Sequence, residues 1–150
     1  MDDGMYQKYS SIELPAQMFE FYSDKIRSDE ILLQVFNYIC EQAVEIRDDE
    51  LAIAVTVKSI VDNVQVKRKV MQPKTGRAKK EKSFVEAVTN IDRNKVDRCL
   101  EILMAMGLVF YRNFGMLKSF YLTNNGKKLF VYMYQQDNGT LPTLEGADNI

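Results

Sequence analysis

The spacing of apolar residues predicts helices in the first third of the chain. Within residues 29–46, apolar positions recur at the spacing of one broad face of an amphipathic helix, which Ser28 or Asp29 can cap. Residues 12–27 are also rich in apolar positions, and Pro15 is tolerated near a first helical turn. Residues 1–11 are polar and are predicted to be a flexible N-terminus.

The middle of the chain is ambiguous by pattern. Residues 51–57 suit a short strand, and residues 56–64 equally suit a short helix opened by a threonine. Residues 66–82 hold a proline and a glycine among many lysines and arginines, so we expect a basic loop or mobile hairpin there. Residues 83–90 are predicted to form a short helix.

A helix–strand–strand–helix pattern follows. Asp92 is a good N-cap for a helix over residues 92–106, and a glycine suits its end. Residues 108–112 and 116–122 are strand-like around a turn. The last predicted helix, 124–136, is apolar on all sides, which suggests burial against a partner subunit. The acidic tail, residues 137–150, is predicted to be disordered.

This order of elements is that of a winged helix-turn-helix. The chain resembles MarR- and PadR-type DNA-binding regulators over residues 84–109 and over residues 121–129. The second stretch looks like the Leu-Thr-x-x-Gly signature that closes the wing in those families. TubR-type plasmid partition proteins share the fold. The resemblance implies a mainly α protein with a small β-wing, hence α+β, and extra N- and C-terminal helices in a single domain, residues 12–136.

Two points of the resemblance stay open. Either 56–64 or 83–90 is the first helix of the motif, and in the former case the basic loop interrupts it. MarR-type wings usually carry an Asp-x-Arg pair for the minor groove, and residues 112–118 lack one.

The net charge of −1 conceals an uneven distribution. Residues 1–65 carry a net −8, residues 66–82 a net +7, residues 83–136 a net +3, and the tail a net −3. Local field rather than total charge decides where a polyanion binds. The basic segments coincide with the motif, so the distribution favours nucleic acid as a partner.

The predicted helix 92–106 has the polar face that a recognition helix needs. Val96, Cys99, Leu100, Leu103 and Met106 share a core stripe, and Asn94 and Arg98 lie opposite with Glu101 and Ala105. Asn pairs with adenine and Arg with guanine, so Asn94 and Arg98 are the candidate base-reading residues. The candidate phosphate contacts are Arg93 and Lys95 on the helix, Arg112 and Lys118 on the wing, and Lys67, Arg68, Lys69, Lys74, Arg77, Lys79 and Lys80 in the basic loop.

Composition argues against an enzyme. The chain has no histidine, so histidine-based catalysis is excluded, and its two cysteines, Cys40 and Cys99, lack CxxC spacing and are expected to be buried. Asp48, Asp49 and Glu50 are adjacent acids that point in different directions, so we expect no metal site and no cofactor. The N-terminus lacks the features of a secretory signal, which favours the cytoplasm.

The sequence-based hypothesis is a cytoplasmic homodimer that binds double-stranded DNA sequence-specifically, as a transcriptional regulator that reads the major groove with helix 92–106. One alternative is a plasmid or viral replication or partition protein, for which the acidic N-terminal half offers a surface to a protein partner. The other is a winged-helix adaptor that binds protein.

Overall fold

The computed structural model describes residues 1–45, 54–72 and 83–139. They form ten elements, in the order α1 (Asp3–Tyr9), α2 (Ala16–Arg27), α3 (Glu30–Glu45), α4 (Val57–Asn63), β1 (Gln65–Gln72), β2 (Ser83–Asn90), α5 (Arg93–Ala105), β3 (Val109–Phe114), β4 (Leu117–Leu122) and α6 (Asn124–Asn138).

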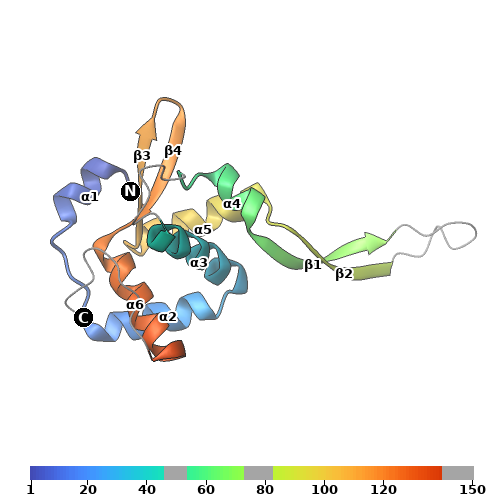
Figure 1. The fold of residues 1–150 in the computed structure, drawn as a ribbon, viewed down its shortest axis with the longest axis horizontal. Helices are drawn as coiled ribbons and strands as arrows, with labels where there is room; N and C mark the ends of the chain where they lie inside the picture. Colours follow the sequence, from blue (N-terminus) through green and yellow to red (C-terminus); the bar gives the residue numbers. More distant parts are fainter. Residues whose placement is uncertain (46–53, 73–82, 140–150) are drawn as a thin grey trace, which may run out of the picture.

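The fold mixes helices with two separate two-stranded antiparallel sheets, in agreement with the α+β class. Helices α2 to α6 surround one apolar core, in which Phe36, Ile60, Leu103 and Leu129 are fully buried. The β3–β4 hairpin rises from this body, and the β1–β2 ribbon projects away from it (Figure 1). Over the described ranges, no helix combines the length and apolarity needed to cross a bilayer.

Helical and strand periodicity predicted the elements of the body well. The predicted helix 29–46 is α3, the predicted helix 92–106 is α5, and the predicted last helix is α6. The two predicted strands near the C-terminus are β3 and β4, joined by a turn at Gly115. Helix α2 begins only at Ala16, with Pro15 as its N-cap residue, so the predicted start at residue 12 was too early.

In the middle of the chain, the structure differs from two expectations. Residues 83–90 are strand β2 rather than a helix, because they pair along their whole length with β1, from Gln65 opposite Asn90 to Gln72 opposite Ser83. Of the two alternatives for residues 66–82, a basic loop or a mobile hairpin, residues 66–72 form a strand of a hairpin, and residues 73–82 lie outside the described residues. Residues 57–63 form helix α4, whose start is fixed by a reciprocal capping box between Thr56 and Ser59. Of the predicted strand 51–57, residues 51–53 lie outside the described residues and residues 54–57 form no strand, although Val55 O accepts a hydrogen bond from Phe120 N.

The N-terminus also differs from expectation, since residues expected to be flexible form helix α1 against β3. Asp2 caps this helix by accepting from Met5 N at 2.8 Å. The ring of Tyr6 stacks on Phe110 with 4.2 Å between centroids, and its hydroxyl accepts a hydrogen bond from Asn124 N. Both contacts join residues more than a hundred positions apart, which explains why a local pattern did not reveal them.

One side of helix α6 packs into the core of its own chain. Leu129 and Met133 belong to the main core, and Val131 packs against Ala43 and Phe130. Phe130, Tyr132 and Tyr134 on the same helix are half-buried, so the core covers only part of its apolar surface. Residues 137 and 138, expected to belong to the tail, extend the helix, and residues 140–150 lie outside the described residues.

The junction between β4 and α6 depends on Thr123 and Gly126. The Thr123 hydroxyl donates to Gly107 O at 2.6 Å and accepts from Gly126 N at 3.0 Å, so one side chain caps α6 and holds the end of α5. A Cβ added at Gly126 would lie 2.2 Å from Leu108 O. The backbone of α6 can approach the start of β3 this closely only with glycine at position 126.

We predict that Gly126→Ala lowers the free energy of unfolding by about 1–3 kcal/mol, because the new methyl group forces backbone apart in a packed interior. Gly4→Ala is the matched control, since its Cβ would meet only Asp2 Oδ1 at 3.6 Å on an exposed helix. That control should leave stability equal or raise it by up to about 1 kcal/mol. Urea unfolding followed by circular dichroism measures both, and equal stability of Gly126→Ala and the native chain would contradict the close approach.

Candidate nucleic-acid interface

The β1–β2 ribbon is inserted between helices α4 and α5. Val64 alone lies between α4 and the start of β1, and Ile91 and Asp92 lie between the end of β2 and α5. Its eight-residue strands span about 26 Å at the usual rise of a β-strand. Along the described part of the ribbon, Val66 is the only buried side chain. The ribbon therefore stands free of the body beyond its root (Figure 1).

The root of the ribbon is joined to the start of α5. Ile91 N donates to Val64 O at 3.1 Å, and both side chains are buried. Arg68 reaches from β1 to Asp92, the N-cap residue of α5, with 3.5 Å between guanidinium nitrogen and carboxylate oxygen. The basic residues of β1 consequently begin beside the N-terminal turn of α5, the end of a helix that favours anions.

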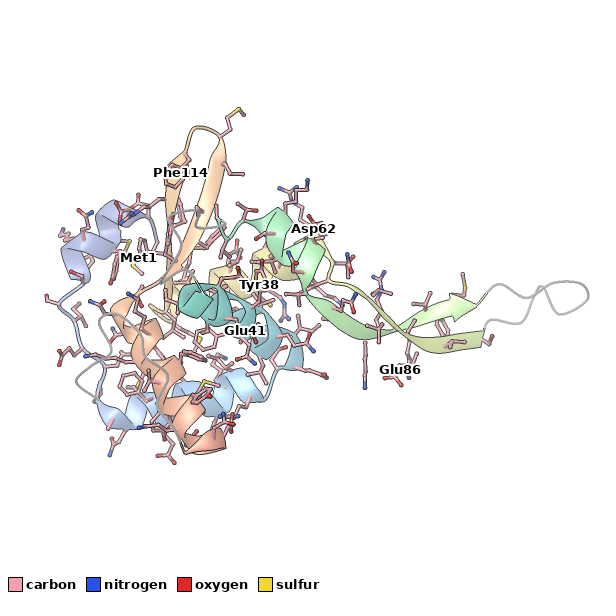
Figure 2. The ribbon with its side chains drawn as sticks, in the orientation of Figure 1. Met1, Tyr38, Glu41, Asp62, Glu86 and Phe114 are labelled. Carbon is pink, nitrogen blue, oxygen red and sulfur yellow. The ribbon has the colours of Figure 1, made fainter. Side chains whose placement is uncertain are left out.

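The register of the ribbon divides its side chains between two faces. One face carries Lys67 opposite Val88, Lys69 opposite Glu86, and Met71 opposite Phe84. The other face carries Arg68 opposite Ala87 and Val70 opposite Val85. Both lysines, Arg68 and Glu86 are exposed, and Figure 2 shows Glu86 on the ribbon, away from the body.

Helix α5 presents the residues expected on its outer face. Val96, Cys99, Leu100 and Leu103 are buried, whereas Arg93, Asn94 and Arg98 are exposed and Lys95 is half-buried. Asp97 and Glu101 are exposed on the same helix, so acids interrupt the positive field. The expected division of the helix into a core stripe and a polar face is confirmed.

Arg98 is not free in this structure. Its guanidinium lies 3.3 Å from Asp29 Oδ2, while Asp29 Oδ1 caps α3 by accepting from Ile31 N and Leu32 N. The side chains are 51% and 32% exposed, so solvent screens the pair and limits its contribution to at most about 1 kcal/mol. Arg98, a candidate base-reading residue, is thus paired with a carboxylate of the acidic N-terminal half, that of Asp29.

The wing residues are engaged as well. Arg112 contacts Asp3 of α1 at 3.2 Å, and its guanidinium lies 5.3 Å from the centroid of the Tyr121 ring. Lys118 Nζ lies 4.5 Å from the centroid of Tyr111. The ion pair with Asp3 joins the wing to α1, so the clamp expected of Arg112 would require it to leave Asp3.

The remaining predicted contacts lie outside the described residues. Lys74, Arg77, Lys79 and Lys80 belong to the segment 73–82 that joins β1 to β2, and the acidic run 48–50 falls in another such segment. Among the described residues, no three His, Cys, Asp or Glu side chains gather as metal ligands. Cys40 and Cys99 are buried, as expected, and burial raises the pKa of both thiols.

The exposed apolar residues of the two hairpins were not predicted from the sequence. The ribbon exposes Val70, Met71, Phe84, Val85 and Val88, and the tip of the wing exposes Phe114, Met116 and Leu117. Phe114 lies toward the free end of the wing in Figure 2. Alternation along residues 66–72 is the available signal for the ribbon, but the lysines and arginines within it are equally typical of a loop.

Comparison with known proteins adds no family: no protein-family model, curated protein or solved structure matches this chain.

Proposed function

We propose that this chain is a winged-helix module that binds double-stranded DNA, with α5 in the major groove and the root of the β1–β2 ribbon on the adjacent backbone. The observation that carries the proposal is the junction of ribbon and helix. There, Lys67, Arg68 and Lys69 begin beside the N-terminal turn that bears Arg93, Asn94 and Lys95.

The order of the elements supports this assignment. A winged helix-turn-helix consists of helix, turn, helix, strand, turn and strand, and α4, α5, β3 and β4 follow that order. The ribbon takes the place of the turn between the two helices. Gly107, with φ of +75°, ends α5 and leads into β3, as capping preferences predicted.

The charge of the junction supports DNA over a protein ligand. The exposed lysines of β1 and the positive end of the α5 dipole suit phosphate oxygens. A segment with a net +7 over residues 66–82 has no evident use in an adaptor that binds neutral or basic protein. We therefore propose a binding protein rather than an enzyme.

Transcriptional regulation is the role that we propose for this binding. Selection of bound fragments from genomic DNA tests it, because a regulator yields single sites near promoters. Clustered repeats would indicate the replication or partition role instead. Light scattering tests the proposed homodimer, for which a two-fold site with half-sites about 34 Å apart is expected.

Lys67→Gln combined with Lys69→Gln should make the salt dependence of DNA binding shallower. If both lysines bind phosphates, the slope of log K against log[salt] falls in magnitude by about 1.8, or about 0.9 for each phosphate that is no longer neutralised. The control, Lys8→Gln with Lys127→Gln, removes the same charge from α1 and α6, on the side of the body away from the ribbon (Figure 1). Fluorescence anisotropy with a labelled duplex at several KCl concentrations measures the slopes, and equal slopes for both variants would contradict binding of the ribbon to the DNA backbone.

Arg98→Ala should reduce specific binding about 5- to 150-fold, since a bidentate contact to guanine discriminates by about 1–3 kcal/mol. The site is first selected from a random library with the native protein, and affinity is then compared between that site and scrambled DNA. Asp29→Asn is the informative partner, because an amide oxygen still caps α3 while the competing charge is removed. We expect it to tighten binding.

The two variants together separate the roles of Arg98. An Arg98→Ala protein with normal thermal unfolding and unchanged preference for the selected site would show that α5 does not read bases through this residue. Tighter binding by Asp29→Asn that persists in the Arg98→Ala background would show general charge repulsion rather than release of Arg98.

A further inference from the structure

The ribbon exposes more apolar surface than an isolated hairpin tolerates well. Its two largest exposed apolar side chains, Met71 and Phe84, are 55% and 62% exposed and lie directly opposite each other near the outer end of the strands. A two-stranded hairpin is only marginally stable alone in water, and both edges of this one are unpaired over the described residues. Such a feature is expected to acquire a partner.

Charge selects the class of partner. On the face that bears Met71 and Phe84, Lys67 and Lys69 lie nearer the root, and Glu86 is the only acid in the two strands. The segment 73–82 beyond them contains five basic residues and one acid in the sequence. Pairing of two such ribbons from two copies would bring like charges together, whereas a polyanion suits both the lysines and this segment.

The dimensions fit a groove of DNA. Met71 lies six positions after Gln65 at the root, a distance of about 20 Å along an extended strand. Neighbouring major and minor grooves are about 17 Å apart along the duplex, half of one helical turn of about 34 Å. With α5 in a major groove and the ribbon directed along the duplex, this length would bring Met71 and Phe84 to the next minor groove.

Methionine and phenylalanine are side chains that minor-groove proteins insert between base pairs. Such apolar wedges unstack one step and kink the duplex by about 20–90°. We propose, resting on the proposed DNA binding, that the β1–β2 ribbon lies in the minor groove beside α5. Met71 and Phe84 together wedge one base step there, so that the protein bends the DNA it binds.

The test compares two double variants, each of which changes one cross-strand pair, on opposite faces of the ribbon. Met71→Thr with Phe84→Thr removes the wedge, and Val70→Thr with Val85→Thr alters the pair at the neighbouring position on the opposite face. Threonine keeps a high strand propensity in both. The probe is a duplex of about 30 base pairs with a donor and an acceptor dye at its ends, so that bending raises energy transfer.

We expect the native protein and the Val70/Val85 variant to raise energy transfer, and the Met71/Phe84 variant to bind without raising it. Netropsin, which occupies A·T-rich minor grooves, should abolish the bend as well. Binding by the native protein with no bend, or equal loss of bend in both variants, would overturn the wedge while leaving DNA binding intact. Failure of the native protein to bind any duplex at low salt would instead refute the proposed function.

A second measurement tests the competing occupant. If light scattering shows that the Met71/Phe84 variant turns a dimer into a monomer while the bend persists, these side chains belong to an interface between copies. That outcome also overturns the wedge. An unchanged oligomeric state together with a lost bend supports it.

Discussion

The hydrogen bond from Ile91 N to Val64 O closes the root of the ribbon, and the relation between α4 and α5 depends on this closure. Residues 64–92 separate the two helices in the chain, yet the paired strands bring the chain back to the point where it left the body. The helices therefore pack against each other as if a short turn joined them. Val66 and Ile91, both buried, anchor the two strands at the edge of the core.

The same closure fixes the direction of the ribbon relative to α5. Arg68 adds a second tie, from β1 to the N-cap residue of α5. In the proposed complex, a DNA duplex that binds α5 would therefore meet the base of the ribbon in a defined place, without the ordering of a disordered arm. A ribbon whose base is already fixed would lose less conformational entropy on binding than a segment that folds only on the DNA.

Local pattern was sufficient where one face of an element meets the core. Helices α3 and α5 were predictable because their buried residues recur at helical spacing, and the β3–β4 hairpin because its glycine turn separates two apolar runs. Strand β2 was not predictable in this way. Phe84, Val85, Ala87 and Val88 suit a helix equally well, and pairing with β1 decided the outcome. Strand β1, its pairing partner, was also not recognised as a strand, because its lysines and arginine are equally typical of a loop.

The candidate site shows the same limit. The outward position of Asn94 and Arg98 follows from the period of α5, but no local pattern places Asp29 beside Arg98. That contact joins the turn before α3 to α5, and the contact of Arg112 with Asp3 joins the wing to α1. Non-local ion pairs of this kind depend on tertiary packing, which residue spacing alone does not encode.

These ion pairs bear on how the proposed interface discriminates among sequences. Arg68, Arg98 and Arg112 each contact an aspartate, and every side chain in the three pairs is at least 32% exposed. Such pairs contribute about 0–1 kcal/mol, so a phosphate or a guanine edge replaces the carboxylate at small cost. The displaced aspartates stay near the DNA, however, and repel it. In the proposed complex, a duplex that offers only phosphates would gain little from the exchange. One that adds base contacts to Arg98 would overcome the repulsion, so the acids beside the arginines would favour specific over non-specific binding.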